Sequence, residues 1–241
     1  MTEGVTPYNT TTAKKEQVAE MFDNIARRYD FLNQLLSLGI HKGWRRKSIR
    51  MLRDSKPKYI LDIATGTGDF AIEALKLNPD KIIGVDISEG MMKYGREKLE
   101  KMNLGGKIEL RSGDSENLAF ADNTFDAITV GFGVRNFEHL EKGLATMLRV
   151  LKPGGTAIIL EFSRPVVFPV KQVYYFYFKW VCPLVGKLLS KDKRAYSYLN
   201  ESVAAFPAGQ DFLKIMARLG FNSCEATPVS FGIATIYKGK K

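Results

Sequence analysis

The sequence contains few residues of the types that build disulfide or metal sites. Its 241 residues include two cysteines and two histidines. Cys182 and Cys224 lie far apart in apolar surroundings, so we expect them to be packing residues in a reducing compartment. With only His41 and His139, a histidine-rich metal site is not expected. No metal is assigned to the predicted site.

Long apolar runs are also missing. No uninterrupted stretch of about 18 apolar residues occurs, and a helix that crosses a bilayer needs roughly that length. The first residues, Met1–Pro7, lack the basic and then apolar order of a signal peptide. We therefore expect a cytoplasmic protein without a membrane-spanning segment.

Positive charge is in excess. Lys and Arg number 36 against 26 Asp and Glu, which leaves a formal net charge of +10. Such a balance favours an anionic partner, either nucleic acid or a phospholipid surface, and charge alone does not choose between them. With 45% hydrophobic residues, the chain can bury one proper core. We expect a flexible tail over residues 1–13 and a single domain over 14–241.

A glycine turn between two predicted strands is the most informative feature. Residues 61–69 run from a strand into the turn, where Gly66 and Gly68 bring the backbone close to a ligand because they have no Cβ. Asp86 ends the next strand and is placed to accept hydrogen bonds from a ribose diol. The pattern predicts a pocket for a cofactor that contains adenosine.

Two cofactor classes compete for this pocket. Residues 66–71 satisfy the G-x-G-x-x-G/A dinucleotide pattern, which is weak by itself. A pyrophosphate needs the electropositive start of a helix, yet Asp69 lies there and Asp62 ends the preceding strand. These carboxylates would repel a pyrophosphate and attract the sulfonium of S-adenosylmethionine. We therefore expect S-adenosylmethionine, the alternative being a strand–turn–helix that binds no ligand.

Strands and helices alternate through the middle of the chain. Strands are predicted near 58–64, 81–86, 107–111, 126–131 and 155–162, and helices near 69–77, 89–102 and 139–151. A helix near 208–219 and an antiparallel edge pair near 221–227 and 231–238 follow. This order indicates an α/β fold, a mostly parallel sheet with helices on both faces. The carboxyl edge of such a sheet would gather Asp62, Gly66, Asp86 and Asp114.

Two helical segments flank this core. Predicted helices near 14–28, 31–38 and 44–52, with a break at Gly39, mix polar groups into an apolar region, which suggests a cap over the pocket at 14–53. Residues 164–205 form an insertion rich in aromatic and basic residues. That insertion either packs as a cover over the site or lies at a membrane headgroup zone and admits an apolar substrate.

Polar residues follow the third and fourth strands. Gly113-Asp114-Ser115 is placed near an adenine amino group, or is a surface turn. Arg135 and Asn136 follow the fourth strand, where Arg135 would stabilise an oxyanion on an acceptor or form a surface salt bridge. The Asn/Asp-Pro-Pro-Tyr/Phe element of nucleic-acid N-methyltransferases and the Pro-Cys element of cytosine C5 enzymes are both absent. Their absence weakens the nucleic-acid alternative.

These features together resemble the menaquinone/ubiquinone-biosynthesis C-methyltransferase family. The matching segments are Tyr29-Asp30 through Asn33, Ser37, His41 and Trp44; residues 122–126 and 132–136; Arg149–Gly155 through Glu161-Phe162-Ser163; and Tyr198–Ser202. The resemblance covers roughly residues 20–238. It implies a Rossmann-like class I S-adenosylmethionine-dependent methyltransferase fold with seven strands.

The resemblance also implies which residues bind the cofactor. By it, Thr67, Asp86, Asp114 and Ser115 are cofactor contacts, beside Asp62, Gly66 and Gly68 of the turn. Gly131 stands where some relatives have a serine that contacts the cofactor, and we do not count it.

The acceptor implied by the resemblance is a polyprenylated hydroquinone, methylated on a ring carbon. We expect demethylmenaquinol to be converted to menaquinol, with the benzoquinol precursor of ubiquinone and an RNA as alternatives. Arg135 would stabilise the phenolate, and the ring proton would go to Asp30, to His41 or to a water held by Arg135 and Asn136. We expect transient contact with the inner face of the cytoplasmic membrane and no nucleic acid partner. A homodimer is one alternative for the oligomeric state.

Overall fold

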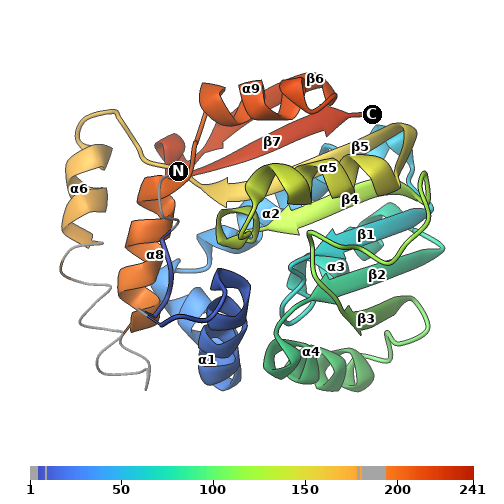
Figure 1. Cartoon of the computed structure of the whole chain (residues 1–241), viewed down its shortest axis with the longest axis horizontal. Coiled ribbons are helices and arrows are strands. Elements are labelled where there is room, and N and C mark those ends of the chain that lie inside the picture. Colours follow the sequence, from blue (N-terminus) through green and yellow to red (C-terminus); the bar gives the residue numbers. More distant parts are fainter. Residues whose placement is uncertain (1–4, 9, 178–179, 181–193) are drawn as a thin grey trace.

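The computed structural model describes residues 5–8, 10–177, 180 and 194–241. A seven-stranded sheet forms its centre (Figure 1). The strands are β1 (Tyr59–Ile63), β2 (Lys81–Asp86), β3 (Ile108–Ser112), β4 (Phe125–Gly131), β5 (Leu151–Phe162), β6 (Asn222–Val229) and β7 (Ala234–Lys240).

The sheet has the order β3-β2-β1-β4-β5-β7-β6. The pairs among β1 to β5 are parallel, and β7 runs antiparallel to both β5 and β6. The strand order therefore reverses between β1 and β4, which lie side by side with Asp62 opposite Thr129. Such a switch point opens a crevice at the carboxyl ends of the strands, where ligands bind in folds of this kind.

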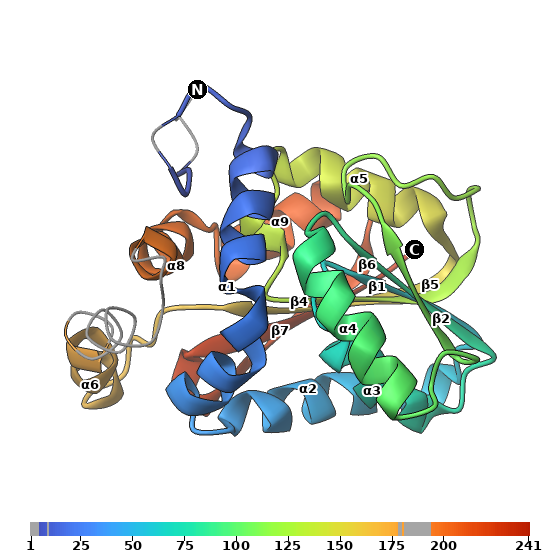
Figure 2. The same ribbon diagram turned by 90° about the horizontal axis from the view of Figure 1, so that it is seen from below.

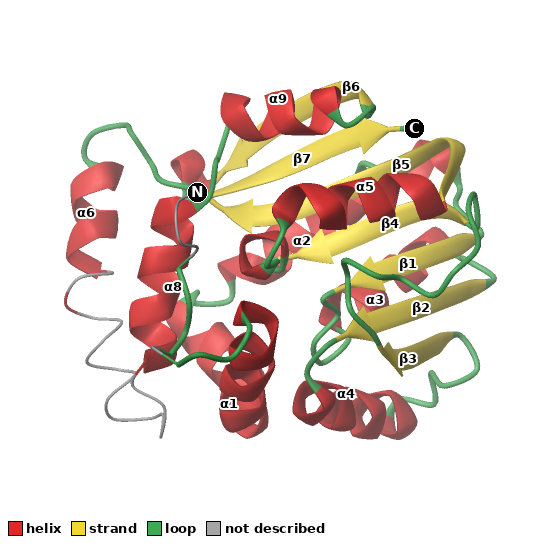
Figure 3. Cartoon of the chain, viewed as in Figure 1, coloured by secondary structure: helices red, strands yellow, loops and turns green. Residues whose placement is uncertain are grey.

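Helices cover both faces of the sheet (Figures 2 and 3). The α-helices are α1 (Lys14–Leu36), α2 (Ile40–Arg50), α3 (Asp69–Ala74), α4 (Glu89–Lys101), α5 (Leu140–Val150), α6 (Val170–Phe176), α8 (Arg194–Ala205) and α9 (Gln210–Arg218). Short 3-10 turns are η1 (Arg53–Ser55), η2 (Leu75–Leu77), η3 (Val134–Asn136) and η5 (Ser230–Gly232). Helices α5 and α9 lie on one face, and α2, α3 and α4 on the other.

Two apolar cores lie on the two faces because side chains alternate along each strand. Leu61 and Ile63 of β1 join the core shared with α5 and α9, whereas Ile60 joins the core shared with α2, α3 and α4. A third cluster joins α1 to Tyr198 of α8. The predicted α/β class, the largely parallel sheet and its antiparallel edge pair are confirmed.

The N-terminal helices differ from the prediction. Residues 14–36 form one continuous helix, so the predicted separation into 14–28 and 31–38 is wrong. Tyr29 and Asp30 lie between the two predicted ranges, but neither is glycine or proline, and the Asp30 side chain bonds to Thr67 and Lys98 instead of competing for its own backbone. The predicted break at Gly39 is confirmed, since its φ of 76° ends the helical path.

Two strand starts also differ. β5 begins at Leu151, before the predicted 155, because Leu151 pairs with Phe125 across an irregularity in the β4–β5 register. Lys152 reaches Asp126 at 2.7 Å there. β7 begins at Ala234 because the 3-10 turn η5 occupies residues 230–232.

The predicted tail and the predicted insertion lie only partly within the described residues. Residues 1–4 and 9 of the predicted tail lie outside them, while Arg194 Nε donates to the carbonyl of Pro7 at 2.7 Å. In the predicted insertion at 164–205, α6 and α8 are described. Cys182 and the interleaved basic residues Lys179, Lys187, Lys191 and Lys193 lie outside the described residues.

Candidate functional site

A cavity lies at the carboxyl ends of β1, β2 and β4, beside α1. The space between its walls, part of which is open to solvent, measures about 700 Å³. Of the predicted site residues, those that line it are Gly66, Asp86, Asp114, Ser115 and Asn136. Apolar and aromatic walls come from Val18, Phe22, Tyr29, Met91, Phe132 and Phe137.

The glycine turn forms one edge of this cavity. Gly66 and Gly68 have φ values of 56° and 80°, which residues with a Cβ rarely adopt. The amide of Gly66 donates to Asp86 Oδ2 at 2.7 Å, so the turn is tied to the end of β2. A Cβ on Gly66 would lie 3.1 Å from Met91 Cε, which lines the same cavity. The turn is therefore shaped to bring backbone next to a ligand.

Asp86 has capacity to bind a diol. Its carboxylate accepts the amides of Gly66 and of Ser88, the latter at 2.9 Å. Burial raises the pKa of Asp86, although these backbone donors oppose the rise. A carboxylate offers about four acceptor positions, and the amide of Ile87 also acts on this one, so at least one position remains for a ribose hydroxyl. The residues at this end of the cavity fit the adenosyl half of S-adenosylmethionine.

Asp114 and Ser115 line the cavity beyond β3. Asp114 Oδ1 accepts the amide of Glu116 at 2.8 Å, and Asp114 Oδ2 lies 3.2 Å from Lys15 Nζ of α1. This carboxylate raises the pKa of the Lys15 ammonium through a hydrogen bond and its charge. The loop after β3 is therefore both a wall of the cavity and a contact point for α1.

Asp62 does not line the cavity. It is fully buried and accepts hydrogen bonds from Thr65 Oγ1 at 2.6 Å and Thr129 Oγ1 at 2.7 Å. Burial raises the pKa of Asp62 to about 6, although the threonine hydroxyls favour its charged form. The position of Asp62 suits a residue that fixes the turn between β1 and β4. Direct contact of Asp62 with a cofactor stays a prediction.

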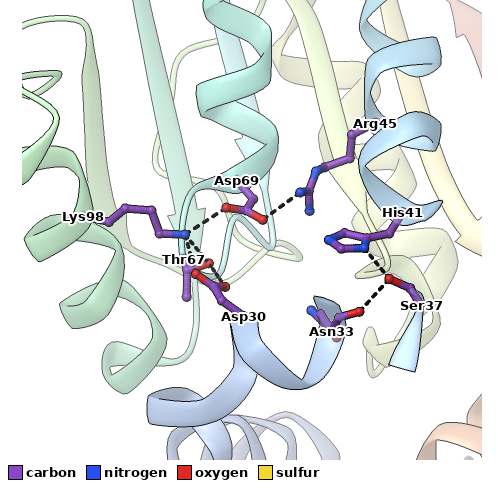
Figure 4. A network of polar contacts seen from close by, with 8 residues as sticks. All are labelled: Asp30, Asn33, Ser37, His41, Arg45, Thr67, Asp69 and Lys98. Carbon is purple, nitrogen blue, oxygen red and sulfur yellow. Dashed lines mark hydrogen bonds and ion pairs between the residues drawn. The ribbon is translucent and has the colours of Figure 1, made fainter. Parts of the chain in front are cut away.

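Thr67 belongs to a polar network that ties α1 to the glycine turn (Figure 4). Its hydroxyl donates to Asp30 Oδ1 of α1 at 2.6 Å. Lys98 of α4 lies between three groups, at 2.6 Å from Asp30 Oδ2, 3.1 Å from Thr67 Oγ1 and 2.8 Å from Asp69 Oδ1. Neither Thr67 nor Asp30 lines the cavity.

Asp69 is not the free negative charge that the sequence argument assumed. Arg45 lies 2.8 Å from its Oδ2, and Lys98 contacts its other oxygen. Burial opposes ionisation of Asp69, but Arg45 and Lys98 lower the pKa overall. The carboxylate is thus charged yet neutralised by two cations. An attraction of Asp69 for a sulfonium stays a prediction; Arg45 and Lys98 could not be foreseen as its partners, because both lie far from Asp69 along the chain.

His41 lies at the edge of the same network. Its ring is buried, and Nδ1 is hydrogen-bonded to the Ser37 hydroxyl, which itself donates to the carbonyl of Asn33 at 2.6 Å. Burial and the nearby Arg45 lower the pKa of His41 to about 4. His41 is therefore neutral at pH 7 and does not line the cavity.

Arg135 lies in η3, directly after β4. Its side chain is 7% exposed, and its guanidinium lies 2.9 Å from Glu161 Oε1 and 5.5 Å from the ring centre of Phe162. Glu161, on β5, is fully buried, and burial raises its pKa although Arg135 opposes the rise. The salt bridge considered for Arg135 therefore exists, but it is buried rather than on the surface.

Asn136 follows in η3 and lines the cavity. Its amide nitrogen lies 3.4 Å from the Phe132 carbonyl. A Cβ on Gly133 would lie 2.4 Å from that of Ala64, so only glycine allows η3 to approach the β1 loop this closely. The close approach places the predicted acceptor residues beside the predicted cofactor residues.

Gly131, which the sequence analysis did not count, also lines the cavity. A Cβ there would lie 2.9 Å from the Phe70 ring. A serine at this position would require Phe70 to move. At Gly131 the chain therefore presents only backbone to the cavity, where some relatives are expected to present a serine side chain.

Helix α1 contacts the segments that follow β1, β2, β3 and β4. Lys14 Nζ donates to the Phe137 carbonyl at 2.9 Å, and Lys15 meets Asp114. Asp23 Oδ1 accepts from the Ser88 hydroxyl at 2.6 Å and from the Gly90 amide at 2.8 Å. Asp30 meets Thr67 and Lys98. α1 is thus held over the cavity at both ends and at its middle.

Several residues of the site were missed from the sequence. Glu161 and Tyr29 belong to the segments that carry the family resemblance, but no spacing rule showed that Glu161 would pair with Arg135. Lys98 and Arg45 were not predicted as site residues, since a sequence does not show which helix faces carry a distant partner. The described residues contain no group of three His, Cys, Asp or Glu that could hold a metal ion.

Comparison with known sequences gives near full-length relatives. Residues 10–241 match the ubiE/COQ5 methyltransferase family. The demethylmenaquinone methyltransferase of Bacteroides fragilis is 52% identical over 99% of this chain and 98% of its own length. The ubiquinone/menaquinone biosynthesis C-methyltransferase UbiE of Geobacter sulfurreducens is 46% identical over 95% of this chain and 90% of its own.

Comparison with solved structures shows the fold. A SAM-dependent methyltransferase of Thermotoga maritima superposes with a TM-score of 0.65 at 18% identity, covering 92% of this chain and 98% of that one. The [4+2]-cyclase SpnF gives 0.61 at 14% identity over 99% of both chains. The chain therefore has the class I methyltransferase fold. SpnF shows that this fold also supports other chemistry.

Proposed function

The chain belongs to the ubiE/COQ5 methyltransferase family, and from that premise we propose that it methylates a ring carbon of a polyprenylated hydroquinone with S-adenosylmethionine, converting demethylmenaquinol to menaquinol. The structural observation that carries the proposal is a buried arginine, Arg135, beside a cavity whose other end suits an adenosyl group. The names of the relatives support the acceptor class.

The chemistry requires an electron-rich ring and a cation next to its oxygen. S-adenosylmethionine supplies a methyl group made electrophilic by a sulfonium. A quinone carbon is itself electrophilic, so the acceptor must be the reduced hydroquinone. Phenols have a pKa near 10, so a positive charge must favour the phenolate at neutral pH. Arg135 supplies that charge. Because its side chain is buried, the charge interacts more strongly with a phenolate than it would in water.

The remaining residues bind and orient the two reactants. Gly66, Asp86, Asp114 and Ser115 hold the cofactor end of the site, and Thr67 ties the glycine turn to α1. Phe132 and Phe137 give it apolar walls, and Asn136 presents a polar group beside Arg135. Holding a ring carbon in line with the transferred methyl group is worth several powers of ten in rate.

The proton acceptor is proposed to be a water held by Arg135 and Asn136. Methyl transfer leaves an extra proton on the ring carbon, and its removal restores aromaticity. Asp30 already accepts hydrogen bonds from Lys98 and Thr67, and the His41 ring is hydrogen-bonded to Ser37. These positions favour the water over Asp30 and His41, the other two candidates from the sequence.

The decisive experiment is methyl transfer from labelled S-adenosylmethionine to reduced demethylmenaquinone whose ring position carries deuterium. We expect a product heavier by one methyl that has lost the deuterium, because carbon rather than oxygen is methylated. The demethoxy-benzoquinol analogue is tested in parallel, since the name of the Geobacter relative includes ubiquinone. Retention of deuterium, or label found only in added RNA, would contradict the proposal.

We further propose that the protein binds the inner face of the cytoplasmic membrane. Large apolar side chains are exposed before, on and after α6: Val166, Val167, Phe168, Val173, Phe176 and Trp180. The Tyr177 hydroxyl donates to the Leu36 carbonyl at 2.7 Å, which joins this region to the end of α1, where Leu38 is 81% exposed. Within the described ranges, no helix combines the length and hydrophobicity needed to cross a bilayer.

Sedimentation with vesicles tests this attachment. We expect Phe168→Ser with Phe176→Ser to reduce binding to anionic phosphatidylglycerol vesicles at least fivefold, since each loses a large exposed apolar side chain. Met102→Ser is the control, because Met102 is also exposed but lies at the end of α4, away from this surface. Equal loss in the control would contradict the proposed surface. Light scattering of the same samples compares the monomer with the homodimer.

A further inference from the structure

Three buried polar side-chain atoms have no hydrogen-bond partner among the described residues. They are Arg135 Nε, Asn136 Oδ1 and the hydroxyl of Tyr198. Buried polar groups are nearly always paired, because an unpaired one loses its bonds to water without a replacement. Three such atoms in one part of the molecule therefore call for a common cause.

The three atoms come from elements that pack together. Arg135 and Asn136 form two of the three residues of η3, and α8, which carries Tyr198, packs against η3. The side chain of Tyr198 is 1% exposed and belongs to the apolar cluster formed with Val18 and Met21 of α1. Val18 also lines the cavity. Tyr198 thus lies between the predicted acceptor residues and the helix beside the cavity.

The charged groups that act on Tyr198 are Arg135 of η3 and Glu161 of β5. Burial raises the pKa of the Tyr198 hydroxyl to about 12, and Arg135 opposes that rise. The hydroxyl is therefore protonated at every pH at which the protein would work. It is a neutral group with a hydrogen to donate, next to a fixed cation.

The unpaired atoms complement the oxygen of a hydroquinone. A phenolic hydroxyl donates one hydrogen bond and accepts two. Asn136 Oδ1 is an acceptor, while Arg135 Nε and the Tyr198 hydroxyl are donors. When the ring oxygen loses its proton, both donors remain available, and bonds to an ionised oxygen are about twice as strong as neutral ones.

We propose that Tyr198 is a further catalytic residue, which donates its hydroxyl hydrogen to a ring oxygen of the acceptor and stabilises the phenolate together with Arg135. This inference deepens the proposed function and rests on it. Tyr198 lies on a helix of the insertion at 164–205, far in sequence from η3. The insertion thus contributes a residue to the reaction, beside the apolar surface that precedes it.

A packing role for Tyr198 makes the opposite prediction. If the ring only fills the cluster with α1, its hydroxyl has a desolvation cost and no benefit. Tyr198→Phe removes that cost and keeps the ring. A packing role therefore predicts a variant that is at least as stable as the wild type and equally active.

The test is Tyr198→Phe, assayed for turnover, thermal stability and S-adenosylmethionine affinity. We expect turnover of demethylmenaquinol to fall on the order of a hundredfold, as when one oxyanion donor is removed. The melting temperature should stay equal or rise, and cofactor affinity should not change. The pH at half-maximal turnover should increase by about one, since the acceptor oxygen becomes harder to ionise when a donor is lost.

Tyr237→Phe is the matched control. Tyr237 is also a fully buried tyrosine, but its hydroxyl accepts the Gly209 amide at 2.7 Å, away from η3. We expect this variant to melt at a lower temperature, with turnover and pH profile unchanged at 25 °C. Wild-type turnover and an unshifted pH profile in Tyr198→Phe would overturn the role of Tyr198. Absence of carbon methylation in the wild-type protein would instead overturn the proposed function.

Discussion

Arg135 and Glu161 form a buried ion pair in which each charge depends on the other. Removing one partner of such a pair leaves an uncompensated buried charge, which costs about 3–5 kcal/mol. An effect of an Arg135 variant on activity can therefore come from lost chemistry or from lost stability. The two causes are separable because Glu161 can be neutralised by an isosteric change.

Arg135→Ala is expected to lower turnover about a hundredfold or more and to leave S-adenosylmethionine affinity unchanged, because Arg135 is proposed to act on the acceptor oxygen. Arg135→Met with Glu161→Gln removes both charges, so stability should recover while turnover stays low. Turnover and calorimetric binding of the cofactor are measured for both variants. Unchanged turnover in either would remove Arg135 from the mechanism.

The contributions of His41 and Asp62 to the free energy of unfolding should change in opposite directions with pH. Burial lowers the pKa of His41 from 6.5 to about 4, so its contribution is fully present above pH 6.5 and is lost as the pH falls toward 4. Burial raises the pKa of Asp62 from 3.8 to about 6, so its contribution is present below pH 3.8 and is lost as the pH rises through 6.

Differences between variants isolate the two groups. Relative to His41→Asn, the wild type should lose roughly 3 kcal/mol of unfolding free energy between pH 6.5 and 4. Relative to Asp62→Asn, the wild type should gain stability over the same range as its carboxyl takes up a proton. Urea unfolding at several pH values measures both differences. Parallel curves for wild type and His41→Asn would show that His41 titrates normally.

Helix α1 is the element on which the closed site depends. Its contacts with the loops around the cavity are made by side chains that lie far apart along the helix, from Lys14 to Asp30. The strongest cluster is at Lys98, which contacts Asp30 of α1, Thr67 of the glycine turn and Asp69 of α3. Three elements thus meet at one ammonium group.

Lys98→Met should loosen α1 without disturbing the sheet. It leaves Asp30 and Asp69 as neighbouring carboxylates whose shared cation is gone, so the C-terminal half of α1 should exchange its amide hydrogens faster. The dissociation rate of S-adenosylmethionine should increase several-fold. Hydrogen exchange and stopped-flow binding measure the two effects. Lys76→Met is the control, because Lys76 lies at the surface and, among the described residues, forms an ion pair with Glu73 alone.

The whole molecule should be stabilised by the cofactor. A ligand that binds only the folded state at a hundred times its dissociation constant adds about 2.7 kcal/mol. For a chain of this length, that free energy raises the melting temperature by roughly 5–10 °C. Scanning calorimetry with S-adenosylmethionine measures the shift, and NADH is the control. A shift with NADH and none with S-adenosylmethionine would contradict the predicted cofactor.

The fold could be predicted from the sequence because its signals are local and repeated. Strand–helix alternation from Tyr59 to Phe162 gives a parallel sheet, and the glycine turn marks its switch point. The continuity of α1 could not be predicted, because the polar face at Asp30 finds its partners on α4 and the glycine turn. Those partners lie 37 and 68 residues further along the chain.

The site could be predicted only in outline. Residues at strand ends, such as Asp86 and Asn136, lie at the cavity because strand ends meet at one edge. Asp62 and Asp69 carry the same charge in the sequence, yet two threonines enclose one and two cations neutralise the other. Such differences arise from tertiary contacts, which a linear pattern does not contain.

One helix serves both reactants. α1 lies along the cofactor cavity through Val18, Phe22 and Tyr29, and it packs on Tyr198 through Val18, Met21 and Leu32. Its 23 residues form a rod of about 35 Å, so a displacement at one end is transmitted to the other. Steady-state kinetics should then give intersecting double-reciprocal plots, the pattern expected when donor and quinol must both be bound before the methyl group is transferred.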